Sequence, residues 1–121
     1  MKYMLLVHHD EETFNRRSEA ERTGLLRESV ELANDLDASG KYLSAAPLHP
    51  TSETVCIRVR DGKRLVTDGP FAETREQLGG YFLVDATDLD EAITIAERIP
   101  MARSGTVEVR PIVELSGLPN C

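Results

Sequence analysis

Two short strand-like runs meet at Asp61-Gly62, in the middle of the chain. From Thr54 to Arg60 apolar side chains occupy alternate positions, and a second run extends from Lys63 to Thr67. Asp-Gly between two such runs is typical of a β-hairpin with a two-residue turn. The centre of the chain is therefore predicted to form an antiparallel hairpin, and the rest of the fold must be arranged on either side of it.

The turn length also predicts which side chains share a face of the hairpin. The expected cross-strand pairs are Val59 with Arg64, Ile57 with Val66 and Val55 with Asp68. Because cross-strand partners point to the same side, Asp68 is expected beside Val55 and Ile57 and partly buried. A bulge would shift the register by one residue and reverse this conclusion.

The flanking segments predict a β-α-β unit on each side of the hairpin. Apolar spacing, capping patterns and prolines give strands over 2–8, 42–48, 81–86 and 106–115, and helices over 19–39 and 89–99. The predicted fold is α+β and ferredoxin-like: an antiparallel sheet with its helices on one face. The other face would be bare, and the apolar run from Lys2 to His8 indicates that it is covered, which favours a homodimer.

Composition limits the class of protein. The chain has 121 residues, enough for one domain over 1–121. A net charge of −7 argues against nucleic-acid binding. No segment has the pattern of a signal peptide or a membrane span, and Cys56 and Cys121 suggest reduced thiols rather than a disulfide framework. We therefore expect a cytoplasmic protein that binds no membrane, and nothing in the sequence implies a cofactor.

The run Asp-Gly-Pro-Phe-Ala-Glu-Thr-Arg-Glu-Gln-Leu-Gly-Gly-Tyr at 68–81 closely resembles the defining motif of the DGPF proteins, a branch of the YCII-related family. The segments 1–6, 59–63 and 107–111 resemble other parts of that family. The resemblance implies a dimeric α+β barrel and hints at a role near sigma-factor-type transcription regulation. A histidine–aspartate pair proposed in the wider family cannot be carried over, because its histidine lies in the first helix and this chain has none between Glu11 and Leu48.

The three histidines are the main candidates for chemistry. His8 and His9 end the first predicted strand and point to opposite faces, so only one can enter a given cleft. Either could act as a general base, and His8 with Asp68 is the predicted catalytic pair. His49 follows the second strand and could converge with them, but no spacing indicates a metal site and none is predicted. The alternative for each is a surface histidine.

The motif loop supplies the remaining candidates. Asp68 could serve only its own turn. Phe71 is interpreted as an anchor or a pocket wall, Glu73 as a ligand contact or a member of a solvated pair, and Tyr81 as a hydroxyl offered to the cleft.

Three functional hypotheses follow. The first is a homodimer that binds a small polar molecule in a cleft between the Asp68–Gln77 loop, the end of the first strand and His49. The second is an enzyme with a histidine–aspartate acid–base pair. The third is an interaction module for a transcription regulator.

Overall fold

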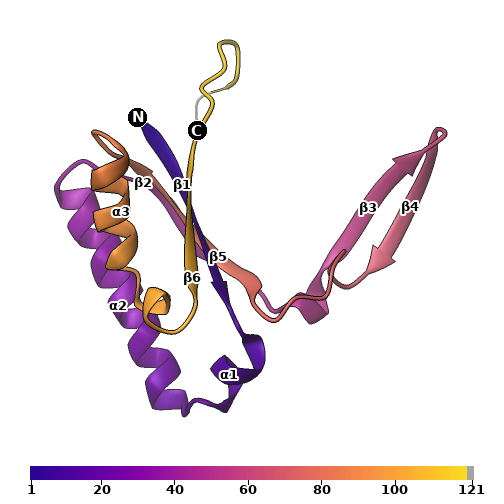
Figure 1. Cartoon of the computed structure of the whole chain (residues 1–121), viewed down its shortest axis with the longest axis horizontal. Helices are drawn as coiled ribbons and strands as arrows, with labels where there is room; N and C mark the ends of the chain where they lie inside the picture. The colour runs from indigo at the N-terminus through magenta and orange to yellow at the C-terminus, as the bar shows by residue number, and fades with distance from the viewer. Residues whose placement is uncertain (120–121) are drawn as a thin grey trace.

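The computed structural model describes residues 1–119, and Cys121 lies outside the described residues. The chain combines an antiparallel sheet, a separate hairpin and three α-helices, which confirms the predicted α+β class (Figure 1). The elements in chain order are β1 (Lys2–His9), α1 (Glu11–Arg16), α2 (Glu19–Ala38), β2 (Tyr42–Pro47), the 3₁₀ turn η1 (Thr51–Glu53), β3 (Val55–Arg60), β4 (Lys63–Asp68), β5 (Gln77–Asp85), α3 (Leu89–Glu97), the 3₁₀ turn η2 (Pro100–Arg103) and β6 (Thr106–Pro111).

The main sheet has the strand order β2-β5-β1-β6, and every neighbouring pair is antiparallel. The strands of each β-α-β unit are therefore separated by one strand of the other unit. This is the split β-α-β arrangement that the order of elements predicted. It places β1 in the interior of the sheet, between β5 and β6.

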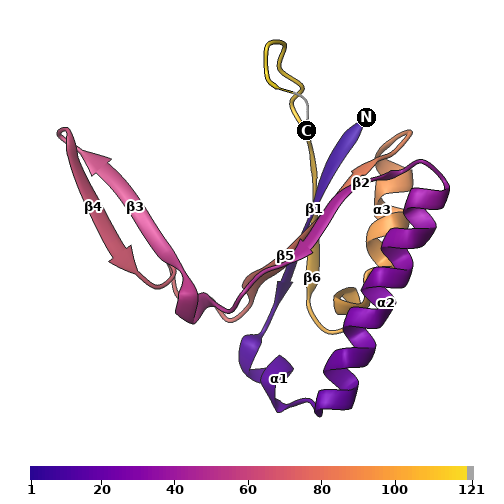
Figure 2. The ribbon, with the colours of Figure 1, turned by 180° about the vertical axis from the view of Figure 1, so that it is seen from behind.

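The core lies between the sheet and the helices α2 and α3, which cover one of its faces (Figures 1 and 2). Strand β1 alternates strictly, so that Tyr3, Leu5 and Val7 are buried while Met4 and Leu6 on the other face stay half-exposed. The other buried apolar residues are Leu32, Leu36, Phe82, Val84, Ala86, Ala92, Ile95, Ala96 and Ile99. None of the helices in residues 1–119 is long and apolar enough to cross a membrane.

The short helix α1 is a feature that the sequence reading missed. The Asp10 carboxylate caps it by accepting hydrogen bonds from the backbone N–H groups of Glu12 (3.0 Å) and Thr13 (3.3 Å). Two acidic residues, Glu11 and Glu12, occupy its first turn, where negative charge stabilises a helix. The sequence from Asp10 to Glu12 is thus a helix start rather than a loop.

Two predicted ends also differ. Helix α3 stops at Glu97, before Pro100, because Ile99 is extended (φ −68°, ψ 125°) and Pro100 begins η2. Strand β6 ends at Pro111, four residues earlier than predicted. The helix expected over 19–39 is confirmed as α2.

The hairpin has the predicted register, with Val55 opposite Asp68, Ile57 opposite Val66 and Val59 opposite Arg64. It forms a sheet of its own, however, and stands away from the body of the molecule (Figures 1 and 2). The prediction that Asp68 is partly buried is wrong: the register holds, but the face that Asp68 shares is exposed in this chain. Local pairing was predictable, whereas the surface against which the hairpin packs was not.

Candidate functional site

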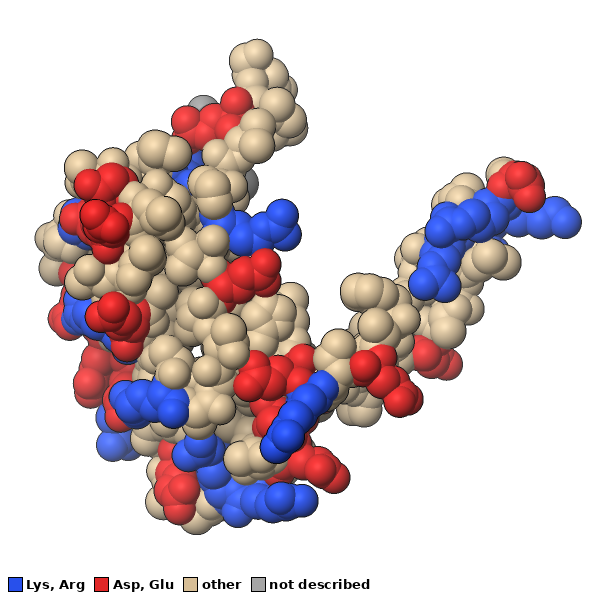
Figure 3. Space-filling view, in the orientation of Figure 1, with Lys and Arg blue, Asp and Glu red and all other residues tan. Residues whose placement is uncertain are grey.

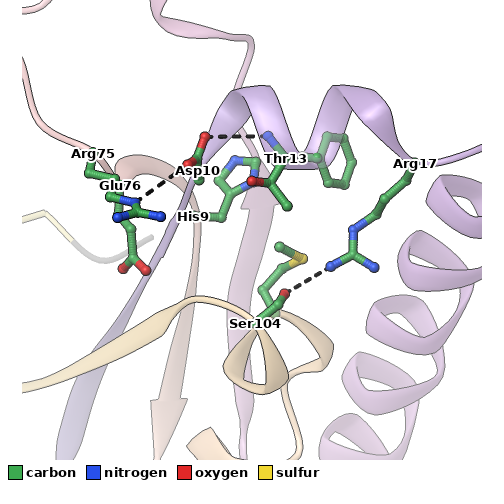
Figure 4. Close-up of a pocket in the computed structure, with 9 residues that line it drawn as sticks. His9, Asp10, Thr13, Arg17, Arg75, Glu76 and Ser104 are labelled. Carbon is green, nitrogen blue, oxygen red and sulfur yellow. Dashed lines mark hydrogen bonds and ion pairs between the residues drawn. The ribbon is translucent and has the colours of Figure 1, made fainter.

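A cavity of about 210 Å³ lies where β1 ends and α1 begins (Figure 4). It draws on the end of β1, helix α1 with its C-cap Arg17, the loop that leads into β5, and the segment after α3. Its lining residues are His9, Asp10, Thr13, Phe14, Arg17, Arg75, Glu76, Met101 and Ser104.

The His9 ring is fixed by its neighbours. It packs edge-on against Phe14, with ring centroids 5.1 Å apart and an interplanar angle of 85°. On the other side it lies against Gly79, where a Cβ would come within 3.0 Å of His9 Nε2, closer than Cβ atoms tolerate. The ring can therefore occupy this position only because residue 79 has no side chain.

Burial sets the protonation state of His9. Loss of solvent lowers its pKa below the ordinary value of 6.5, and nearby carboxylates, led by those of Glu11 and Asp10, oppose part of this shift. The ring is thus predominantly neutral at pH 7. Its Nδ1 atom is buried and has no hydrogen-bond partner within the described residues.

Arg17 brings a positive charge to the same cavity. Its Nη2 donates a hydrogen bond to Ser104 Oγ at 3.0 Å, which orients the guanidinium (Figure 4). Its Nε is buried and, like His9 Nδ1, finds no partner in the part of the chain that the structure describes. A buried polar atom without a partner is rare, so two of them on residues that line one cavity indicate a place where a polar ligand could bind.

The Asp10 carboxylate, on the acidic side of the cavity, already has partners within the protein. Asp10 caps α1, and Arg75 Nε lies 3.9 Å from Asp10 Oδ2. Arg75 is 92% exposed and stands at the rim with Glu76. Because the Asp10 carboxylate already serves the helix, it is not positioned to orient His9 as in a catalytic dyad.

The YCII-related domain family matches residues 1–116. This chain belongs to that family. The chain is also 36% identical over 114 residues to the uncharacterized protein R00369 of Rhizobium meliloti (strain 1021), covering 93% of this chain and 92% of that protein. The match confirms the resemblance seen in the motif at 68–81, and the name of the YCII-related relative states no activity.

The structure separates most of the predicted site residues. His8 lies on the open face of the sheet, where its Nε2 is 3.1 Å from Glu108 Oε1, and it forms no pair with Asp68 in the exposed hairpin. His49 is 87% exposed and pairs with Glu53 at 3.1 Å. Neither His8 nor His49 lines the cavity with His9. The possible convergence of these residues is therefore not seen in the single chain, where β1 and the hairpin belong to different sheets.

The other motif residues also lie apart from the cavity. Phe71 is 80% exposed rather than an anchor, and Glu73 is exposed in the same loop. Tyr81 is half-buried on the sheet, and its hydroxyl lies 3.0 Å from Ser44 Oγ. No cluster of three or more metal-binding side chains occurs in residues 1–119. The roles of these residues in binding or catalysis stay predictions.

The cavity also contains residues that sequence reasoning missed, chiefly Arg17 and Ser104. They are 87 positions apart, so no local pattern connects them. A signal did exist for the pocket itself: the acidic N-cap pattern at Asp10 predicts a helix that brings Thr13 and Phe14 over the end of β1. Gly79, within the motif at 68–81, makes room for His9 because it has no side chain.

Proposed function

We propose that this YCII-related protein binds a small polar molecule with an anionic group in the cavity beside His9. One observation carries the proposal: His9 and Arg17 line the same cavity, and each has one buried nitrogen, His9 Nδ1 and Arg17 Nε, without a hydrogen-bond partner among residues 1–119. Leaving such groups unsatisfied costs about 1–3 kcal/mol each. A ligand that accepts hydrogen bonds from them would recover this free energy.

The chemistry of the lining defines the ligand class. Arg17 carries a permanent charge and offers several donors, which suits a carboxylate or a similar planar anion. The carboxylates of Asp10 and Glu76 favour a hydroxyl or another donor elsewhere on the ligand. A cavity of about 210 Å³ is smaller than pockets for drug-sized molecules, which begin near 300 Å³. A small hydroxy acid or a comparable metabolite fits these limits.

The test is a binding screen of small carboxylates against their neutral amides, followed by calorimetry. The wild type should bind a carboxylate in preference to its amide. Arg17→Gln should weaken binding by roughly 10- to 100-fold, the effect of losing a hydrogen bond to a charged group. Arg17→Lys should restore part of the affinity because it keeps the charge, and His49→Gln, at an exposed loop residue, is the control. Equal affinity of the wild type and Arg17→Gln would contradict the proposal.

A second candidate function is proton transfer by His9. The lowered pKa of the half-buried imidazole favours it, since a general base must be unprotonated to accept a proton. For any carboxylate that binds, exchange of its α-hydrogen in deuterated buffer can be followed by NMR. The wild type should catalyse exchange and His9→Gln should not, although it still binds. Exchange at the same rate in both proteins would contradict proton transfer by His9, and only the binding proposal would remain.

We also propose that the protein is a cytoplasmic homodimer of the dimeric α+β barrel type, in which the open faces of two sheets pack together. The half-exposed apolar residues Met4, Leu6, Tyr81 and Leu83 support this arrangement, because they lie on the face that α2 and α3 leave uncovered. Light scattering on the wild type should give twice the monomer mass at micromolar concentration. Leu6→Asp, which places a charge in the middle of that face, should give a monomer.

A further inference from the structure

The hairpin β3–β4, residues 55–68, forms an arm with one largely apolar face, which also carries Arg64 and Asp68. Its pairing places Val55, Ile57, Val59 and Val66 on the same side, and each of the four is more than half exposed, from 54% to 65%. A two-stranded sheet on its own is only marginally stable in water. A contiguous exposed apolar face on such an element is the mark of an interface.

The root of the arm is tied to the body rather than free. The Glu11 carboxylate accepts hydrogen bonds from both the N–H (2.9 Å) and the hydroxyl of Thr51, just before β3. Gly69 N–H donates to the Thr54 carbonyl at 2.7 Å, which closes the hairpin at its base. The arm therefore leaves the body in a defined direction, and an open space separates it from the uncovered face of the sheet (Figure 3).

We propose that the arm packs on a second copy of this chain, so that the hairpin of each protomer in the homodimer contacts the body of the other protomer. This inference rests on the dimer proposed above and adds a second contact to it. Both surfaces offered to the partner carry apolar side chains: the arm has Ile57 and its neighbours, and the uncovered face of the sheet has Met4 and Leu6. In a dimer with a two-fold axis, the arm of each protomer would meet the same surface of the other, so the contact would form twice.

Charge also favours a second copy as the occupant. Residues 55–68 contain four basic side chains and two acidic ones, so the arm carries +2 and the rest of the chain, which totals −7, carries −9. The basic groups gather toward the tip of the arm, and acidic groups are spread over the body (Figure 3). An exchanged arm would place its positive tip against an acidic partner, an arrangement that favours association of the correct surfaces.

Analytical ultracentrifugation of arm variants over 1–100 μM tests the inference. Ile57→Asp places a charge in the middle of the apolar face and should raise the dimer dissociation constant by about 100-fold, since it acts at both arms of the dimer. Thr67→Asp is the matched control: it adds the same charge to the opposite face of the same hairpin and should change the constant by less than about 3-fold. Circular dichroism should show the same helix content in all three proteins.

The outcomes separate the arm from the sheet. A wild type that stays monomeric at 100 μM overturns both the dimer and the arm contact, and would assign the exposed face to a different partner. A dimer that Leu6→Asp disrupts but Ile57→Asp does not overturns the arm contact alone. If Ile57→Asp does not fold, the milder Ile57→Ser should weaken the dimer in the same direction, and an unchanged constant would overturn the inference.

Discussion

Gly79 and the His9 ring occupy adjoining positions at the end of the sheet, and the pocket depends on both. The ring lies against the glycine and Phe14, which partly bury it, and Nδ1 has no hydrogen-bond partner among residues 1–119. A side chain at position 79 would collide with the ring. The position of the His9 imidazole thus depends on the absence of a side chain at Gly79.

Gly79→Ala should therefore destabilise the protein by about 1–3 kcal/mol, the typical cost of overpacking a tight site. Gly24→Ala is the control, because a Cβ at this position in the middle of α2 meets no atom within 4 Å in the described structure. That substitution should stabilise the protein by about 0.5–1 kcal/mol through helix propensity. Urea unfolding measures both changes, and effects of the same sign would disprove the steric role of Gly79.

The lowered pKa of His9 predicts a pH dependence. Below pH 6.5 the unfolded chain binds a proton at this residue that the folded chain resists, so the free energy of unfolding should fall as the pH drops from 6.5 toward the folded pKa. His9→Gln should remove this part of the dependence, with His49→Gln as the control. NMR should show the His9 imidazole titrating below 6.5, and a midpoint at or above that value would contradict the burial argument.

At the scale of elements, the arm shows which features local sequence rules determine. Asp61 and Gly62 both have positive φ, 51° and 72°, as a tight turn of the Asn-Gly or Asp-Gly kind requires. That turn fixes the register, so the pairing of Val59 with Arg64 could be predicted from sequence. The expectation about Asp68 failed because burial of a hairpin face depends on what packs against it. The alternating apolar pattern of residues 54–67 does not indicate which surface packs against the hairpin.

The other elements divide in the same way. Helix α2 was predictable because its Ser18 cap and apolar spacing are local signals. Helix α1 was missed because it spans only Glu11–Arg16, too short for periodicity to register. The pocket residues Arg17 and Ser104 meet only once the β-α-β units are assembled, so no local pattern could join them.

Gly69 gives a prediction for the base of the arm. Its φ is 89°, and its N–H bonds to Thr54, so the Asp-Gly-Pro turn does require the conformation that glycine allows. Gly69→Val should cost on the order of 1–3 kcal/mol. Thr67→Val, an exposed strand position two residues earlier, should be neutral or slightly stabilising. Equal melting temperatures for Gly69→Val and the wild type would show that the turn is not strained.

At the scale of the whole molecule, the fold consists of a well-packed body and an arm outside it. Leu5 and Val84 are fully buried in the body, while β3 and β4 contain only exposed or half-exposed residues. The arm contact proposed above would add to the free energy that orders the hairpin.

Hydrogen exchange should reveal this division. The amides of β1 and β5 should be protected at every protein concentration because these strands lie inside the sheet. Amides of β3 and β4 should become more protected as the concentration rises from 1 to 100 μM, and the Ile57→Asp variant should lose this change. Arm protection that is independent of concentration would mean that the hairpin is stable alone.

The loop between β4 and β5 joins the arm to the rim of the pocket. It leaves the hairpin at Gly69 and returns to the sheet at Gln77, and on the way it places Arg75 and Glu76 at the cavity. A molecule that drew Arg75 inward would thus act on the base of the arm, and an arm held by a partner would restrict the position of Arg75. If the ligand raised the association constant of the dimer by some factor, dimer formation would raise the affinity for the ligand by the same factor, because the two equilibria are thermodynamically linked. The loop between β4 and β5 would then couple ligand binding in the cavity to formation of the dimer.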